Sequence, residues 1–354
     1  MRYANNAVVP VCAGMTGAGF ISCFLPMGCN MRSKNGVLSI FVAAMAFFAV
    51  GNAAAADWPA RSIRWIVPYP PAGTTDILAR IIGQRLSEKL GQTIVIDNRP
   101  GAGNNLGTEI AIKAAPDGYT WFLVNPANAI NASLYEKLNF NFLADVEPIA
   151  GFIRVPNVMV VTNKNFAPRT VAEFIAHGKA PGSKINWASS GSGTSVHLSG
   201  EMFKMMTGVN MLHVPYKGAG PALIDMIAGQ MHVIFDNMPS SIGYIRSGDL
   251  RALGVTTAQR SPALPNVPTV AETVPGYEAS AWFGVGAPKG TPAAIVNRVN
   301  REVNELLRDP KMLQRLADLG GTPIAGSPSD FWAIHKMETE KWAKVVKASG
   351  AKVQ

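Results

Sequence analysis

The sequence predicts an α/β protein made of two units with a cleft between them. Short β-branched apolar runs alternate with amphipathic helical patterns over residues 63–124, and the same alternation resumes over residues 158–255. Residues 259–278 are rich in proline and turn residues, and an apolar run follows at 281–285. We therefore expect the chain to leave the second unit through a surface crossing and to return to the first.

In the first unit the apolar runs predict three strands, with helices between them. The strands are expected at 63–67, 93–97 and 120–124, and the helices at 76–90 and 106–114. Gly91 is the expected C-cap of the first helix, because glycine adopts the left-handed conformation without a steric cost. Consecutive β-branched strands joined by helices form βαβ units, so the pattern favours a parallel sheet.

The second unit repeats this design with its own apolar runs. Strands are expected at 158–161, 185–188, 211–214, 232–235 and 253–255, and the main helices at 194–207 and 221–228. Thr170 and Glu173 have the spacing of a capping box, which predicts a short helix after the first of these strands.

The C-terminal part is predicted to be mainly helical after the strand at 281–285. Helices are expected to begin at Thr291-Pro292, Asp309-Pro310 and Ser327-Pro328, because a capping residue followed by proline is typical of a helix start. The last helix is expected to end near Gly350.

We therefore expect one lobe to comprise residues 57–157 and 280–354, and the other residues 158–279. A chain that crosses between lobes twice or more forms a natural hinge.

Residues 31–56 have the pattern of a cleaved secretory signal peptide. Arg32 and Lys34 precede an apolar stretch at 37–50, and three alanines end at position 56. The apolar stretch is short for a transmembrane span, although an uncleaved anchor is the alternative. Residues 1–30 look like an upstream extension, with Met31 as the true start.

Composition excludes several classes of function for the mature chain. All three cysteines, Cys12, Cys23 and Cys29, precede the cleavage site, which excludes disulfides and a cysteine nucleophile. Cleavage removes three positive charges, so the formal charge falls from +9 to +9 − 3 = +6. No basic helix face or basic–aromatic run indicates nucleic acid, and the scattered histidines lack metal-binding spacing. A diffuse positive charge suits an anionic small molecule.

The stretch YPPAGTTD, at residues 69–76, is the first candidate binding loop. It joins a strand to a helix, and the free N–H groups and dipole of a helix start favour an anion. The candidate ligand-binding residues here are Tyr69, Pro71, Ala72, Gly73, Thr74, Thr75 and Asp76. Asp76 either meets the anion through water or accepts from a ligand ammonium or hydroxyl group. A capped helix after a rigid proline turn is the structural alternative.

A second loop, at residues 186–203, places hydroxyl groups at another helix start. The candidate ligand-binding residues are Ser189, Ser190, Gly191, Thr194 and Ser195. An esterase that uses Ser192 or Ser195 with His197 is the alternative. The loop lacks the G-x-S-x-G spacing that a serine hydrolase of this kind requires, which disfavours that alternative.

Two further positions complete the candidate site. Tyr216, next to Lys217, follows a strand and precedes a helix, and Asp236 lies at the carboxyl end of another strand, where ligands bind in open α/β sheets. Glycines in the stretch 98–107 suggest a dinucleotide fingerprint, but their spacing does not match it. We expect that stretch to pack beside the first loop, and we expect no cofactor.

Several motifs in one order resemble a known family. The chain from Asp57 to the C-terminus is similar to the Bug-type periplasmic receptors of tripartite tricarboxylate transporters. The matching motifs are IRxIVPY at 63–69 with Pro71, Gly73 and DxxAR at 76–80, NRPGAG at 98–103, APDGYT at 115–120, GTSxHL at 193–198, VPYKG at 214–218 and LPxVPT at 264–269. Ala72 and Asn104 depart from the family pattern, in which glycine is expected, and these departures bear on the size and pose of the ligand.

The resemblance implies a two-lobed Venus-flytrap protein with the type 2 periplasmic binding protein fold. It implies capture of a small organic anion that carries a carboxylate, and delivery to the membrane permease subunits of the transporter without any reaction. We expect a monomer. A role as the ligand-loaded partner of a membrane sensor uses the same fold and remains the other interpretation.

Overall fold

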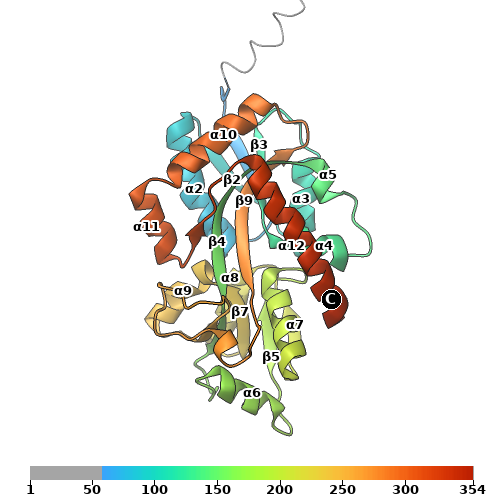
Figure 1. The fold of residues 1–354 in the computed structure, drawn as a ribbon, viewed down its shortest axis with the longest axis vertical. Coiled ribbons are helices and arrows are strands. Elements are labelled where there is room, and N and C mark those ends of the chain that lie inside the picture. The colour runs from blue at the N-terminus through green and yellow to red at the C-terminus, as the bar shows by residue number, and fades with distance from the viewer. Residues whose placement is uncertain (1–57, 354) are drawn as a thin grey trace, which may run out of the picture. The chain divides into compact units, whose positions relative to one another are not determined.

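The computed structural model describes residues 58–353, which lie within one compact unit, Ala54–Gln354. The predicted upstream extension and signal peptide lie outside the described residues. Within the described part, helices surround a continuous path of strands, as Figure 1 shows.

The strands follow the spatial order β2-β1-β3-β9-β4-β7-β5-β6, with β8 and β10 also paired to β4. Their bounds are β1 (Ile63–Val67), β2 (Ile94–Asn98), β3 (Thr120–Val124), β4 (Val146–Thr162), β5 (Asn186–Ser189), β6 (Leu212–Pro215), β7 (Val233–Asn237), β8 (Leu250–Val255), β9 (Ser280–Pro288) and β10 (Thr322–Pro323). Parallel pairing is confirmed for β1 with β2 and β3, and for β5 with β6 and β7. Strands β4 and β9 run antiparallel to their neighbours.

The helices include the predicted ones and several that the sequence analysis missed. Their bounds are α2 (Thr74–Leu90), η2 (Ala102–Asn104), α3 (Asn105–Ile112), α4 (Pro126–Leu134), α5 (Phe142–Asp145), α6 (Val171–Lys179), α7 (Ser195–Thr207), α8 (Ala219–Ala228), α9 (Met238–Ser247), η3 (Val270–Glu272), α10 (Ala293–Leu306), α11 (Pro310–Asp318) and α12 (Pro328–Ser349). Gly91 is the left-handed C-cap that was expected, and the last helix ends at Gly350 as predicted, where this glycine is also a left-handed C-cap. Asp309 and Ser327 cap helix starts.

One helix start was predicted wrongly. The N-cap of α10 is Pro292, not Thr291, and it makes no side-chain capping bond. The Thr291 hydroxyl donates instead to the carbonyl oxygen of Pro288 at 2.8 Å, which directs the side chain toward the preceding turn.

Strand β4 is longer than the predicted strand at 158–161 and joins two parts of the sheet. Its first part pairs with β9, and its last part pairs with β7 and β8. The first part of β4 contains prolines and a glycine, so its sequence does not have the pattern of a strand. Proline in a sheet is confined to edges and irregular positions. The pairing with β9 does shift register there, between Pro148 and Ala150 and again between Gly151 and Ile153.

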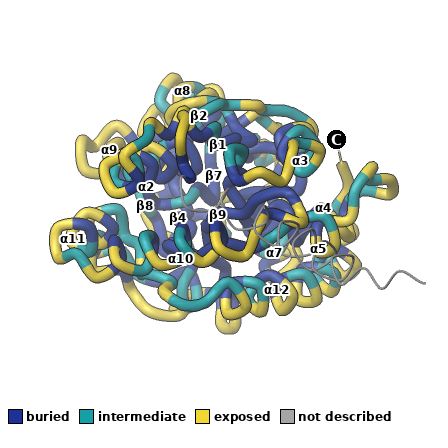
Figure 2. Tube along the Cα trace, turned by 90° about the horizontal axis from the view of Figure 1, so that it is seen from above, coloured by how far each residue is buried: buried dark blue, intermediate teal, exposed yellow. Residues whose placement is uncertain are grey.

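The two parts of the sheet form two lobes. The first lobe contains β1, β2, β3, β10, most of β9 and the start of β4, covered by α2–α5 and α10–α12, and the second contains β5–β8 and the end of β4, covered by α6–α9 (Figure 1). Separate buried clusters support them, one centred on Trp65, Trp121 and Phe152 and another on Phe174, Trp187 and Phe235. In Figure 2 the strands are buried and the outer faces of the helices are exposed.

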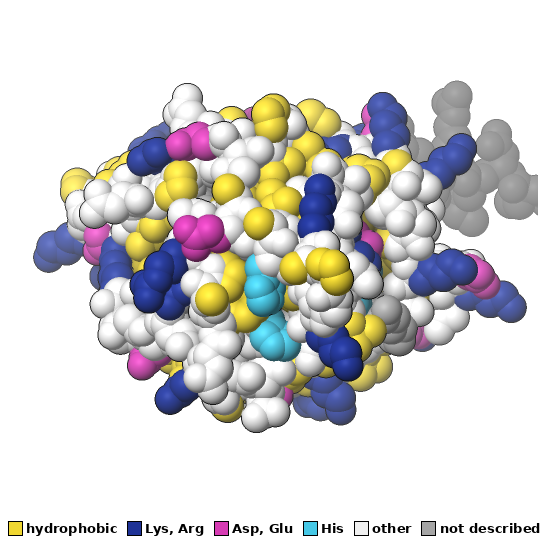
Figure 3. Space-filling model, turned by 90° about the horizontal axis from the view of Figure 1, so that it is seen from below, with side chains coloured by type: hydrophobic (Ala, Val, Ile, Leu, Met, Phe, Trp, Pro, Cys, Tyr) yellow, Lys and Arg dark blue, Asp and Glu magenta, His cyan; other side chains and the backbone are white. Residues whose placement is uncertain are grey.

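The face seen in Figure 3 carries Lys and Arg side chains at scattered places, with acidic and apolar side chains between them. Positive charge on that face is therefore dispersed and does not form a basic patch.

Candidate ligand-binding site

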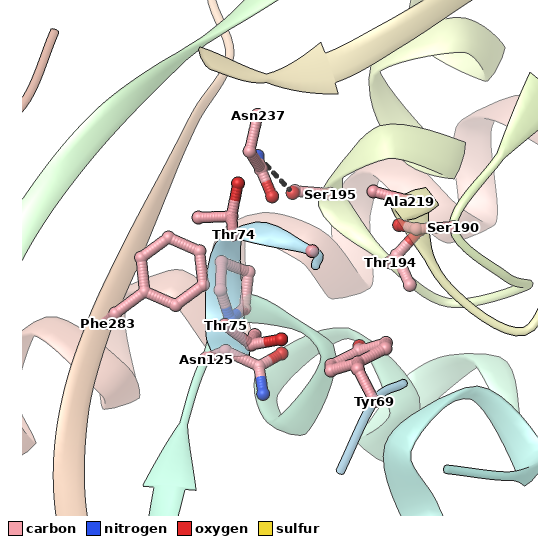
Figure 4. A pocket seen from close by; sticks show the side chains of 12 residues that line it. Tyr69, Thr74, Thr75, Asn125, Ser190, Thr194, Ser195, Ala219, Asn237 and Phe283 are labelled. Carbon is pink, nitrogen blue, oxygen red and sulfur yellow. Dashed lines mark hydrogen bonds between the residues drawn. The ribbon is translucent and has the colours of Figure 1, made fainter. Parts of the chain in front are cut away.

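A small cavity lies between the lobes and is lined from both of them. Its volume is about 30 Å³, roughly the space of two water molecules. The lining residues are Tyr69, Gly73, Thr74, Thr75, Asn125, Pro126 and Phe283 from the first lobe, and Ser190, Thr194, Ser195, Ala219 and Asn237 from the second (Figure 4). No charged side chain lines this cavity, so neutral donors define its chemistry.

Five helices begin at this cavity. Their N-cap residues are Gly73 for α2, Asn125 for α4, Thr194 for α7, Gly218 for α8 and Asn237 for α9. The first N–H groups of a helix lack an intrahelical acceptor, and the helix dipole adds positive potential at the same end. The N-caps of α2, α8 and α9 make no side-chain capping bond. Donors from both lobes therefore remain for an anion in the cavity.

The first binding loop is held in shape by Asp76. This buried carboxylate accepts from the Ala72 N–H and the Asn98 Nδ2, each at 3.1 Å, and pairs with Arg80 at 2.9 Å. Burial raises the pKa of Asp76, but the hydrogen bonds from Arg80, Ala72 and Asn98 outweigh burial and lower it overall. Asp76 does not line the cavity, and its partners show that it braces the loop.

Asp236 lies behind the cavity and does not line it. Its carboxylate is fully buried and accepts from the Ser240 hydroxyl at 2.5 Å, and Ser240 in turn accepts from Thr74 at 3.0 Å. Burial raises the pKa of Asp236 to about 7, although hydrogen bonds from Ser240, Asn237 and Ser241 oppose that shift. Asp236 is thus connected to the cavity through Ser240 and Thr74, and through its hydrogen bond from the backbone of Asn237.

The second loop is organised around the start of α7. Thr194 Oγ1 accepts from the His197 N–H at 3.2 Å, which caps the helix, and donates to the Gly191 carbonyl at 2.8 Å. Ser195 Oγ accepts from Asn237 Nδ2 at 3.2 Å, the dashed line in Figure 4. These bonds fix both side chains toward the cavity.

The arrangement does not favour a serine–histidine pair. His197 Nδ1 accepts from the Gly193 N–H at 3.2 Å, and its ring stacks on that of His213 with the centroids 4.3 Å apart. Burial, followed by the charges of His213 and Lys204, lowers the pKa of His197 to about 3. A base with so low a pKa is poorly matched to proton abstraction near neutral pH.

Comparison with known proteins identifies the family. The model of the tripartite tricarboxylate transporter family receptor matches residues 78–351. The chain belongs to this family. It is 38% identical to the protein BugT of Bordetella pertussis over 328 residues, which cover 92% of this chain and all of BugT.

Solved structures agree with this assignment. R. palustris Rpa4515 with adipate is 40% identical, has a TM-score of 0.82 and covers 84% of this receptor and 100% of its own chain. The periplasmic binding protein BugD is 32% identical with a TM-score of 0.80, covering 84% of this receptor and 100% of its own chain. The receptor therefore has the two-lobed Venus-flytrap fold of periplasmic binding proteins.

The structure brings together half of the residues that the sequence analysis selected. Tyr69, Gly73, Thr74, Thr75, Ser190, Thr194 and Ser195 line the cavity of the receptor. The others lie elsewhere. Pro71 and Ala72 are exposed at the loop surface, Ser189 is buried beneath the second loop, and Gly191 and Tyr216 line a neighbouring cavity.

Five lining residues were missed, namely Asn125, Pro126, Ala219, Asn237 and Phe283. Asn125 and Pro126 follow the strand at 120–124 as a capping residue and a first-turn proline, a helix-start pattern that the sequence displays. Asn237 directly follows the selected Asp236 at the end of β7, and its position at a strand end is the signal that could have found it. Phe283 had no local signal, because β9 returns from a distant part of the sequence.

Residues 58–353 of the receptor lack two kinds of feature. No group of three or more histidine, cysteine, aspartate or glutamate side chains is placed to hold a metal ion. No helix in this range has both the length and the apolar character needed to cross a membrane.

Proposed function

We propose that this receptor captures a small carboxylate-bearing solute in the cavity between its lobes and delivers it to a tripartite tricarboxylate-type membrane transporter. One observation carries the proposal, namely the convergence of helix N-termini from both lobes on a cavity with no charged lining. The N–H donors and helix dipoles stabilise a bound anion there, whereas they do not stabilise a cation. Relatives support the same chemistry, since Rpa4515 was solved with adipate and MatC with malate.

The proposal includes closure of the lobes on the solute. It takes residues 57–157 and 280–354 as one lobe and 158–279 as the other, and the separate hydrophobic clusters support this division. Strand β4 and the segment between β8 and β9 connect the lobes, and such double crossings act as hinges. Each lobe supplies half of the polar lining, so the bound solute favours the closed state.

We also propose that the receptor carries out no reaction, works as a monomer and reaches the periplasm through a cleaved signal peptide at residues 31–56. The low pKa of His197 and the engagement of its Nδ1 by a backbone N–H support the absence of an esterase activity. The proposed partners are the permease subunits of the transporter.

The proposed function is tested by thermal denaturation with a panel of mono- and dicarboxylates, each paired with its neutral amide. We expect one or more carboxylates to raise the Tm in proportion to the logarithm of their concentration, and the amides to have no effect. A generic ester assay on the same preparation is expected to show no hydrolysis. Equal shifts for acids and amides would contradict anion capture, and hydrolysis abolished by Ser195→Ala would favour the esterase.

A further inference from the structure

Two buried histidines lie directly behind the loop of residues 189–195, which helps to line the ligand cavity. His197 belongs to the first turn of α7 and His213 to β6, and they are 1% and 7% exposed. Their rings stack with the centroids 4.3 Å apart, and the ring of His213 also packs on that of Trp187 in β5, at 4.4 Å. The three rings thus form one stack that joins three elements of the second lobe.

His197 holds one of the two glycines of this loop. Its Nδ1 accepts a hydrogen bond from the Gly193 N–H at 3.2 Å, so Nδ1 carries no proton. The proton of the neutral ring then lies on Nε2, which is 3.8 Å from Glu201 Oε1. A second proton on the ring would place an N–H at Nδ1 opposite the N–H of Gly193 and break the bond between them.

His213 holds the other glycine through Ser189. Its Nε2 lies 2.7 Å from Ser189 Oγ, which in turn accepts from the Gly191 N–H at 3.2 Å. The side chain of Ser189 is fully buried, and within residues 58–353 its hydroxyl proton has His213 Nε2 as its acceptor. We therefore assign Nε2 as unprotonated, which makes His213 a neutral acceptor like His197.

The two anchored positions lie next to the groups that face the ligand. Gly191 has φ 123° and Gly193 has φ 83°, in the range of positive φ that favours glycine. Ser190, Thr194 and Ser195, beside and after these glycines, line the ligand cavity. The glycine N–H groups thus point back toward the imidazole rings, while the hydroxyl-bearing residues of the same loop face the cavity.

The surroundings of the two histidines keep them uncharged. Within residues 58–353, Glu201 and Lys204 of α7 are charged groups close to the His197 ring. Burial, followed by the charges of His213 and Lys204, holds the pKa of His197 at about 3. Two imidazolium rings stacked at 4.3 Å would also repel each other strongly. The pair therefore accepts hydrogen bonds from the loop and does not supply positive charge to an anion.

We propose that His197 and His213 are positioning residues for anion capture, a neutral pair that anchors Gly193 and Gly191 and so sets the geometry of the loop that holds the carboxylate. Neither ring lines the ligand cavity. The proposal rests on the proposed function, because it takes the carboxylate to lie beside the hydroxyl groups of this loop. It gives a role to two histidines that stand beside an anion site without being cationic.

Matched substitutions separate an acceptor from a packing group. His197→Asn keeps an oxygen close to the position of Nδ1, and His213→Gln keeps an amide close to Nε2, whereas leucine at either position keeps only bulk. Calorimetry with succinate and adipate measures affinity, after thermal denaturation has shown each variant folded. We expect each leucine variant to bind about tenfold more weakly, since a buried donor loses its acceptor, and the amide variants to stay within about threefold. His177→Leu, at an exposed position near the end of α6, is the control and should bind like the unaltered receptor.

The charge of the pair is tested separately. An ordinary histidine titrates near pH 6.5, and a cationic one beside the cavity would strengthen binding as the pH falls through that value. We expect the affinity for fully ionised succinate to stay constant between about pH 6 and pH 8, in the unaltered receptor and in His197→Asn alike. Nitrogen-15 spectra of the histidine-labelled receptor are expected to show His197 Nδ1 and His213 Nε2 without protons.

Full affinity in the folded leucine variants, or equal losses in the leucine and amide variants, would overturn the positioning role while the proposed function stands. So would an affinity that rises on acidification in the unaltered receptor but not in His197→Asn. Failure of succinate, adipate and every other carboxylate to bind the unaltered receptor would overturn the proposed function, and this inference with it.

Discussion

Thr74 Oγ1 donates a hydrogen bond to Ser240 Oγ at 3.0 Å, which joins the first turn of α2 in one lobe to the first turn of α9 in the other. Both side chains are buried. The bond is therefore a direct polar contact between the lobes beside the ligand cavity, and we expect it to break when the lobes separate.

Replacing Ser240 by alanine removes this contact without changing the cavity lining. A neutral hydrogen bond contributes about 0.5–1.5 kcal/mol, so Ser240→Ala is expected to weaken carboxylate binding by about two- to tenfold. Calorimetry measures the affinity, and Ser247→Ala, at the exposed end of the same helix, is the control. Unchanged affinity together with unchanged compactness in small-angle scattering would show that the contact does not hold the lobes together.

Asn237→Asp tests whether the cavity selects against negative charge. Asn237 Nδ2 donates to Ser195 Oγ at 3.2 Å and to Asn157 Oδ1 at 3.0 Å, and aspartate keeps the shape but loses both donors. Like charges brought together cost several kcal/mol, so affinity for a carboxylate is expected to fall by more than about a hundredfold. Asn210→Asp adds the same charge at an exposed position and controls for net charge. Equal affinity for both variants would exclude a carboxylate beside Asn237.

The buried carboxyl group of Asp236 makes stability depend on pH. The pKa of Asp236 is about 7 in the folded protein and about 4 in the unfolded chain. Between about pH 4 and pH 7, Asp236 is therefore protonated in the folded protein and ionised in the unfolded chain. Stability then falls as pH rises from about 4 to 7 and stays low above 7. Asp236→Asn removes this contribution.

The variant is therefore expected to gain stability relative to the unaltered protein as pH rises, and to be clearly more stable at pH values above about 7. Denaturant unfolding at several pH values from about 4 to above 7 gives the difference in free energy of unfolding between the two proteins. Contributions from the titration of other groups cancel in this difference. A difference that does not vary with pH would show that Asp236 is ionised throughout.

Asp76→Asn distinguishes bracing of the loop from contact with the ligand. Its carboxylate is engaged by Ala72, Asn98 and Arg80, so we expect a modest loss of affinity that is the same for carboxylates with and without an amino group. Calorimetry with succinate and aspartate measures both cases. A loss confined to aspartate would place Asp76 against the ligand ammonium group.

The sequence predicted most of this fold because its elements carry strong local signals. Apolar β-branched runs marked the strands, and pairs such as Asp309-Pro310 and Ser327-Pro328 marked helix starts. The first part of β4 was hidden by its prolines and glycine, and its pairing depends on β9, far away in the chain. Nothing local could reveal a strand that forms only when a distant segment returns.

The site was predicted less completely, for a related reason. Local patterns showed which loops precede helices, and both selected loops contribute to the cavity. They did not show the direction of a side chain, so Asp76 and Asp236 were chosen although both turn toward protein partners. Phe283 enters the cavity from a strand with no polar signal, and only the packing of the two lobes places it there.

Gly73→Val tests most directly whether the ligand carboxylate lies at the start of α2. Gly73 has φ −85° and ψ 168°, which valine can adopt, and a β-carbon there would meet Ala219 only at ordinary contact distance, 3.8 Å. The variant should therefore fold, with the added methyl groups occupying the cavity. Gly243→Val, where a β-carbon meets nothing within 4 Å, is the matched control.

The measurement is calorimetry with the carboxylate that binds the unaltered receptor best, after thermal denaturation has shown both variants folded. We predict that Gly73→Val lowers affinity by at least about a hundredfold, and more than Thr74→Ala, which removes one hydroxyl and is expected to cost about tenfold. Gly243→Val should bind like the unaltered receptor. Full affinity in a folded Gly73→Val variant would contradict the account, because it would place the carboxylate away from the helix N-termini.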